Sequence, residues 1–142
     1  MSREQGRGNA IKVFLVGDSD FVLTRITSLI AGVQGIDIVG GAQNPLTAIN
    51  QIKTLKPDAV ILDLRLHKRF GVDVLQNISE MMPAPATIMV ATSSFCRSAR
   101  EVKKKPDIIL DKFTEWSKIP EILKRIFPKG NPHISANSSA NP

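Results

Sequence analysis

The chain has 142 residues, of which 42% are hydrophobic, and a formal net charge of +6 at pH 7. This length favours a single domain that can bury a real core, and the hydrophobic content excludes disorder for most of the chain. A single cysteine, Cys96, excludes an internal disulfide and fits a reducing, cytoplasmic compartment.

Neither a membrane nor a nucleic acid is an expected partner. The N-terminal residues are polar and Gly-rich without an apolar signal core, and no apolar run approaches the roughly 20 residues of a membrane span. The positive charge permits binding to acidic surfaces. The basic residues are nevertheless spread along the chain and form no recognised nucleic-acid motif, so a soluble protein with a basic surface is the simpler interpretation.

The first half of the chain alternates apolar runs with stretches of helical period, which predicts βα units around a parallel sheet. A strand ending at Asp18 is followed by a helix with Asp20 as its N-cap, and a second strand covers residues 36–40. Asn44 and Pro45 are typical of a helix N-cap and first helical residue. That helix is expected to end at Pro57 and to bury a stripe made of Leu46, Ile49, Ile52 and Leu55.

The second half continues the alternation. A strand ending at Asp63, a loop over residues 64–71 and a strand ending at Thr92 are expected, with a helix between the last two. A polar helix over about 98–104, a last strand from Pro106 and a last helix ending at Pro128 follow. The apolar stripes of the third and last helices are Val72, Leu75, Ile78 and Met82, and Ile119, Ile122, Leu123, Ile126 and Phe127.

The expected organisation is five strands and five helices in one domain over residues 11–128. Residues 1–10 are expected to be flexible. Residues 129–142, rich in Asn, Ser, Gly and Pro, have no apolar period and are expected to be disordered.

Four of the expected strands end in groups suited to phosphate chemistry, namely Asp18, Asp63, Thr92 and Lys112. The carboxyl ends of parallel strands meet at one crevice, so these side chains should gather there. Asp63 can act as a nucleophile that forms an aspartyl phosphate, and Asp18 can hold Mg2+, which prefers oxygen ligands. Thr92 can donate a hydrogen bond to a phosphoryl oxygen, and Lys112 can pair with Asp63 and then with the phosphate.

Each of these residues also has a simpler interpretation. Asp18 alone could be a helix cap, Thr92 a turn residue replaceable by Ser93 or Ser94, and Lys112 a solvated charge. Asp63 is the strongest single candidate, because a carboxylate that closes an apolar Val-Ile-Leu run costs energy unless it is partnered.

The chain resembles the receiver domain of the bacterial response-regulator family from residue 11 to about 127. The resemblance is carried by Leu-Val-Gly-Asp-Ser at 15–19, Asp-Ala-Val-Ile-Leu-Asp-Leu-Arg-Leu at 58–66, Gly71, Ile-Met-Val-Ala-Thr at 88–92 and Asp-Ile-Ile-Leu-Asp-Lys at 107–112. It implies an α/β, doubly wound (βα)5 flavodoxin-like fold, with a five-stranded parallel sheet in the order 2-1-3-4-5.

The resemblance also implies the role of each site residue. Asp63 matches the phosphoacceptor and Asp18 one metal-holding acid, while the backbone carbonyl at Arg65 matches a further Mg2+ ligand. Thr92 and Lys112 match the switch hydroxyl and the invariant lysine. A sensor histidine kinase or a histidine phosphotransfer protein would be the donor, and a downstream protein would receive the signal. The only chemistry implied is self-catalysed phosphoryl acceptance and autodephosphorylation, so the chain is not expected to be an enzyme in its own right.

Two positions depart from the family pattern. The family usually has two adjacent acids after the first strand, and Gly17 stands at the first, which predicts weaker Mg2+ binding. Ile109 stands where the family often has an aromatic residue whose rotamer reports phosphorylation. With Arg97 and Arg100, Ile109 belongs to the face that resembles the partner-binding surface, although a solvated helix face is the simpler interpretation of the two arginines.

Three other functions remain alternatives. Gly17 supports a degenerate receiver that acts as an interaction module without phosphorylation. The net charge alone motivates a nucleic-acid-binding domain, and the α/β topology permits a small hydrolase, although no second general acid accompanies a nucleophile.

Overall fold

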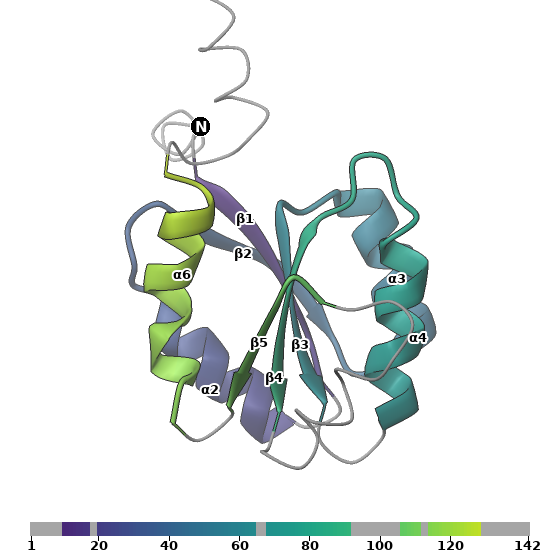
Figure 1. Cartoon of the computed structure of the whole chain (residues 1–142), viewed down its shortest axis with the longest axis horizontal. Coiled ribbons are helices and arrows are strands. Elements are labelled where there is room, and N and C mark those ends of the chain that lie inside the picture. The colour runs from purple at the N-terminus through teal and green to yellow at the C-terminus, as the bar shows by residue number, and fades with distance from the viewer. Residues whose placement is uncertain (1–9, 18–19, 65–67, 92–105, 112–113, 129–142) are drawn as a thin grey trace, which may run out of the picture.

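Five parallel strands form the central layer of the molecule, in the order β2-β1-β3-β4-β5. The computed structural model describes residues 10–17, 20–64, 68–91, 106–111 and 114–128. Helices α2 and α6 cover one face of the sheet, and helices α3 and α4 cover the other (Figure 1). The predicted doubly wound fold and its strand order are therefore confirmed.

The elements follow one another as expected over the described residues. The strands are β1 (Ile11–Val16), β2 (Ile36–Ala42), β3 (Ala59–Leu64), β4 (Ala86–Ala91) and β5 (Ile108–Asp111). The helices are α2 (Asp20–Ile30), α3 (Pro45–Leu55), α4 (Lys68–Ile78), the short 3-10 helix η1 (Trp116–Lys118) and α6 (Ile119–Ile126). The polar helix predicted over 98–104 and both chain ends, 1–9 and 129–142, lie outside the described residues.

The core consists of two layers, because successive side chains of a strand point to opposite faces of the sheet. Phe14, Val60, Leu62 and Met89 pack with the buried residues of α3 and α4. Val13, Leu15, Ile61 and Val90 pack with those of α2 and α6. Strands buried on both faces explain the continuous apolar runs in the sequence.

Helix α3 begins as its sequence predicts, but its buried stripe differs from the prediction. The side chain of Asn44 accepts a hydrogen bond from the backbone N–H of Thr47 at 3.1 Å, and Pro45 is the first helical residue. Ala48 and Ile52 are the buried positions, whereas Leu46 is 68% exposed and Leu55 39% exposed. Leu46 lies two residues before Ala48, and this spacing turns it about 200° around the helix axis, away from the sheet.

The third predicted helix is shifted towards the N-terminus. Helix α4 begins at Lys68, inside the predicted loop, and ends at Ile78, so Met82 lies beyond it and is 95% exposed. Two basic residues, Lys68 and Arg69, stand at the start of the helix, where their charge opposes the helix dipole. Leu75 and Ile78 are buried as expected.

The start of α2 also differs by one residue from the prediction. Asp20 is the first residue of the helix rather than its N-cap, and its carboxylate accepts a hydrogen bond from the side-chain amide of Gln43 after β2. This contact links the two chain segments at the carboxyl end of the edge strand β2. Over the part of the chain that the structure describes, no helix is long and apolar enough to cross a membrane.

Candidate functional site

The carboxyl ends of the strands lie along one edge of the sheet, the lower edge in Figure 1. Asp63 of β3 pairs in register with Val90 of β4, which pairs with Leu110 of β5. One step further on, Leu64, Ala91 and Asp111 form the last described row. Thr92 and Lys112 directly follow Ala91 and Asp111 in the chain.

Several predicted site residues lie outside the described part of the chain. These are Asp18, Arg65, Thr92, Arg97, Arg100 and Lys112. Their predicted roles stay predictions, whereas Gly17, Asp63 and Ile109 can be placed directly.

Asp63 is a buried carboxylate at the carboxyl edge. It is only 3% exposed, although it is the penultimate residue of its strand. It follows Leu62, which packs on the α3 and α4 side, so alternation along the strand turns Asp63 towards the α2 and α6 side. Burying a carboxylate at such a position costs free energy unless polar or cationic groups compensate its charge. Buried titratable groups of this kind are found most often at functional sites.

Gly17 lies directly beside Asp63. It follows β1, and its backbone N–H donates to the carbonyl of Ala42 at 3.1 Å. A Cβ atom at this position would lie 3.3 Å from the Cβ of Asp63 and 3.2 Å from Cδ2 of Leu23 in α2. It would also lie 3.7 Å from Oδ2 of Asp63. A side chain at position 17 would therefore stand against the Asp63 carboxylate, and the glycine leaves that carboxylate without an acidic neighbour from this position.

The described residues fit part of a magnesium site. Mg2+ prefers carboxylate and carbonyl oxygens and keeps several waters. Asp63 offers such a carboxylate at the edge of the sheet, while Gly17 offers none. Nowhere in the described ranges do three or more His, Cys, Asp or Glu residues gather as a metal cluster. The remaining predicted ligands, Asp18 and the carbonyl of Arg65, belong to the segments outside the description.

Ile109 lies one row before Asp63 and packs on the other face of the sheet. It is half-buried and contacts the core cluster that contains Phe14 and Met89, on the side of α3 and α4. The position that carries a reporting aromatic residue in many family members is therefore occupied here by an aliphatic side chain that contributes to the core.

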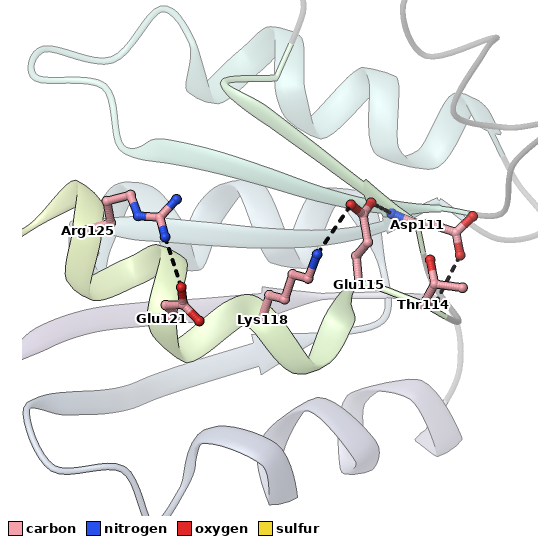
Figure 2. A network of polar contacts seen from close by, with 6 residues as sticks. All are labelled: Asp111, Thr114, Glu115, Lys118, Glu121 and Arg125. Carbon is pink, nitrogen blue, oxygen red and sulfur yellow. Dashed lines mark hydrogen bonds and ion pairs between the residues drawn. The ribbon is translucent and has the colours of Figure 1, made fainter.

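The turn after β5 contains a set of polar contacts that the sequence interpretation missed (Figure 2). Oε1 of Glu115 accepts a hydrogen bond from the backbone N–H of Asp111 at 2.7 Å. Oδ1 of Asp111 accepts one from the N–H of Thr114 at 3.1 Å, and the N–H of Glu115 donates to the carbonyl of Asp111 at 3.0 Å. An Asp at the end of a strand is a signal for such a turn, because Asp side chains bond to nearby backbone N–H groups.

The chain matches known proteins along most of its described length. Residues 13–114 match the response regulator receiver domain family. A protein-glutamate methylesterase/protein-glutamine glutaminase from Caulobacter vibrioides is 37% identical over 82 residues, which cover 58% of this chain and 24% of that protein. One from Oleidesulfovibrio alaskensis is 28% identical over 118 residues, which cover 77% of this chain and 33% of that protein. The match thus spans a third or less of these relatives.

Solved structures share the fold at low identity. The signal receiver domain of the putative response regulator NarL from Mycobacterium tuberculosis superposes with a TM-score of 0.71 at 15% identity, covering 84% of this chain and 98% of that one. The response regulator domain of Thermotoga maritima CheB superposes with a TM-score of 0.67 at 22% identity, covering 84% and 96%.

Fold, strand order and the buried Asp63 at the carboxyl edge agree with the sequence match. The match to residues 13–114 covers well over half of the chain. The chain belongs to the response regulator receiver domain family.

Proposed function

We propose that this receiver domain is a phosphorylation-dependent switch of a two-component phosphorelay, in which Asp63 accepts a phosphoryl group. The observation that carries the proposal is the buried Asp63 carboxylate at the carboxyl edge of the sheet. A carboxylate can serve as the nucleophile in phosphoryl transfer, and little else is required of the protein besides positioning and charge stabilisation. The donor would be a sensor histidine kinase or a histidine phosphotransfer protein, and the switch would act on a downstream protein in the cytoplasm.

Mg2+ is the expected cofactor, held by Asp18, Asp63 and the backbone carbonyl of Arg65. When bound, it neutralises charge on the phosphoryl oxygens. Gly17 supplies no ligand, so we expect Mg2+ to bind more weakly than it does beside two adjacent acids. Thr92 would donate to a phosphoryl oxygen, and Lys112 would pair with the carboxylate and later with the phosphate.

The chemistry of the chain itself would be limited to accepting the phosphoryl group and releasing it by autodephosphorylation. The methylesterase and glutaminase names belong to relatives that the match spans only in part. The proposal therefore takes no substrate from them and treats the chain as a switch rather than an enzyme.

Gly17 favours one alternative function. A receiver that lacks an acid beside its phosphoacceptor could serve as an interaction module without phosphorylation. Its partner affinity would then not depend on a phosphoryl group.

Intact-mass measurement after incubation with acetyl phosphate, with and without Mg2+, tests the proposal. We expect a Mg2+-dependent phosphoryl adduct that is lost in Asp63→Asn. The control variant Asp107→Asn keeps an oxygen that can accept the bond from Thr87 at the opposite edge, and it should still form the adduct. An absence of adduct at high Mg2+ would favour the interaction module, and an adduct that persists in Asp63→Asn would place the phosphoacceptor elsewhere.

A further inference from the structure

A cavity of about 640 Å³ lies at the amino edge of the sheet, the upper edge in Figure 1 and the end opposite to Asp63. It is lined by residues 56–58, 81–86, 107 and 126–127, all of which the structure describes. The first three segments lead directly into β3, β4 and β5, and the last lies at the C-terminal end of α6. Small-molecule sites in proteins have volumes of about 300–1,000 Å³, so this cavity is large enough for one small organic ligand.

Most of the residues that line the cavity are apolar. Met81 packs against the core on the α3 and α4 side, whereas Ile126 and Phe127 pack against the core on the α2 and α6 side. Side chains from both faces of the sheet therefore bound the cavity. Met82, which is 95% exposed, adds a flexible thioether that can adapt to the shape of a ligand. An apolar ligand body would be stabilised here by the removal of this surface from water.

The charged residues that line the cavity are two carboxylates and one ammonium group. Asp58 and Asp107 are fixed in position, because Oδ2 of each accepts a backbone N–H at 2.8 Å, from Lys12 and Thr87 respectively. The Thr87 hydroxyl also donates to Oδ2 of Asp107, at 3.3 Å. Asp107 is exposed and takes part in no ion pair among the described residues, so its Oδ1 can accept a hydrogen bond from a ligand. Lys56 supplies the single positive charge against these two carboxylates.

We propose that this cavity binds a small organic cation, with an apolar body against the cavity wall and an ammonium group that donates to Asp107. The charge complementarity favours this class of ligand, because an anion would meet the Asp107 carboxylate and leave it without a partner. A hydrogen bond between an ammonium and a carboxylate is also stronger than one between neutral groups. The inference is independent of the proposed function, since the cavity and Asp63 lie at opposite ends of the sheet.

Tryptamine and indole-3-propionate are matched probes, because they share an indole body and a two-carbon linker and carry opposite charges. Backbone amide shifts of the full chain in an NMR titration follow their binding. Asp58, Ala86 and Phe127 report on the cavity, and Gly17 and Leu64 report on the carboxyl edge. We expect tryptamine to shift the first three amides alone, with a Kd on the order of 1 mM.

Tryptamine should bind roughly fivefold more tightly than indole-3-propionate, the difference expected for a partly solvated charge pair. The net charge of +6 would by itself favour the anionic probe, so a preference for the cation cannot arise from the overall charge of the protein.

Three variants test the roles of the charge and of the cavity. Asp107→Asn removes the charge and keeps an oxygen for the Thr87 N–H, so it should weaken tryptamine binding roughly fivefold. Glu121→Gln removes an exposed carboxylate that does not line the cavity, and it should bind tryptamine like the wild type. Ala84→Trp places a large side chain at an exposed position of the wall, and it should weaken the binding of both probes.

Several outcomes would overturn the inference. These are the absence of shifts at Asp58, Ala86 and Phe127 with tryptamine at about 10 mM, an affinity for indole-3-propionate equal to or above that for tryptamine, and an unchanged tryptamine affinity in Asp107→Asn. Sedimentation of the protein without probe tests the other occupant. Self-association of the wild type that is lost in Met82→Asp would assign the cavity to a second copy of the chain and overturn the inference, whereas a monomeric wild type supports it.

Discussion

Strands β3 and β5 have nearly the same local sequence and different surroundings. Lys-Pro-Asp-Ala-Val-Ile-Leu-Asp at 56–63 resembles Lys-Pro-Asp-Ile-Ile-Leu-Asp at 105–111, so an aspartate stands at or near each end of both strands. β3 lies in the middle of the sheet, between β1 and β4, whereas β5 is an edge strand. The comparison separates what a local sequence determines from what its neighbours determine.

At their amino ends the two strands make the same contact, in which an aspartate accepts a backbone N–H of the neighbouring strand. Asp58 accepts the backbone N–H of Lys12 in β1 at 2.8 Å, just before the β1–β3 pairing begins. Asp107 accepts the N–H of Thr87 in β4 at 2.8 Å, just before the β4–β5 pairing begins. In each case the carboxylate accepts a backbone N–H that has no carbonyl partner in the parallel pairing of the two strands. The role of both contacts is therefore structural.

At their carboxyl ends the strands diverge. Asp63 is buried beside Gly17, at the carboxyl edge of the sheet where we propose the phosphate chemistry. Asp111 instead bonds within its own segment: its carboxylate accepts the N–H of Thr114, and its own N–H donates to Oε1 of Glu115. The β5 motif is one residue shorter than the β3 motif, so Asp111 lies one row beyond Asp63 and on the other face of the sheet. The surroundings of each carboxylate therefore depend on its row as well as on the position of its strand in the sheet.

The largest loss of stability should come from removing the hydrogen bond between Asp58 and the backbone N–H of Lys12 at the start of β3. Asp58 is 5% exposed, so Asp58→Ala leaves the Lys12 N–H without its acceptor in a buried position. We expect the free energy of unfolding to fall by about 2–3 kcal/mol, as is typical for a hydrogen bond to a charged group. Urea unfolding monitored by circular dichroism measures this, with Asp58→Asn as the milder control. A loss under about 0.5 kcal/mol would contradict the structural role of Asp58.

The equivalent change at the edge strand should cost less. Asp107 is exposed, so water can replace part of what Asp107→Ala removes from the Thr87 N–H. The expected loss is about 1–2 kcal/mol in the same unfolding measurement. Thr87→Val, which keeps the shape and deletes the hydroxyl that accepts the Asp107 N–H at 2.9 Å, serves as a companion variant. A loss for Asp107→Ala equal to that for Asp58→Ala would show that strand position does not matter here.

The regular parts of the fold could be predicted from the sequence. Continuous apolar runs and one good capping pair, Asn44 with Pro45, depend on neighbours close in the chain, and they led to the parallel strands and the start of α3. The strand order, which is also correct, came from the resemblance to receiver domains. The wrong predictions concern which apolar residues of a helix are buried, and the periodicity of the sequence does not reveal this. The apolar residues Leu46 and Met82 are exposed because helix rotation and helix ends decide burial, not hydrophobicity alone.

The candidate site also contains features that the local sequence predicts and features that it does not. Asp63 was found because a carboxylate closing an apolar run is a strong local signal. The closeness of Gly17 to Leu23 and Asp63, and the bond from Lys12 to Asp58 across 46 residues, arise from tertiary packing, which residue type and spacing alone do not specify. Glu115 was missed because a glutamate just after a strand usually means a solvated charge.

Adding an acid beside Asp63 tests how the neighbours of this carboxylate affect metal binding at the carboxyl end of β3. Gly17→Asp should bind Mg2+ about tenfold more tightly than the wild type, a difference of about 1.4 kcal/mol, because it adds a third carboxylate to the proposed ligands Asp18 and Asp63. It should also lose about 1 kcal/mol of stability, since its Cβ would lie 3.2 Å from Leu23 and 3.3 Å from Asp63. Calorimetric Mg2+ titration and urea unfolding give the two quantities.

Gly17→Asn is the matched control for that prediction. It has almost the same volume as the aspartate and no charge, so it should lose similar stability without the gain in Mg2+ affinity. Equal Mg2+ affinities for the wild type and Gly17→Asp would contradict the inference that Gly17 weakens the metal site.

The smallest loss of stability should come from substituting Glu121, which lies in α6 and contacts neither β3 nor β5 through its ion pair. Its ion pair with Arg125 at 2.8 Å joins two exposed side chains of one helix, and such i,i+4 pairs contribute about 0.3–0.5 kcal/mol. Glu121→Ala should therefore change the free energy of unfolding by no more than about 0.5 kcal/mol, less still at high salt, where exposed pairs are screened. Urea unfolding at low and high salt checks both values. A larger loss that persists at high salt would mean that Glu121 stabilises α6 by packing rather than by charge, and Glu121→Gln, which keeps most of the side chain, would then behave like the wild type.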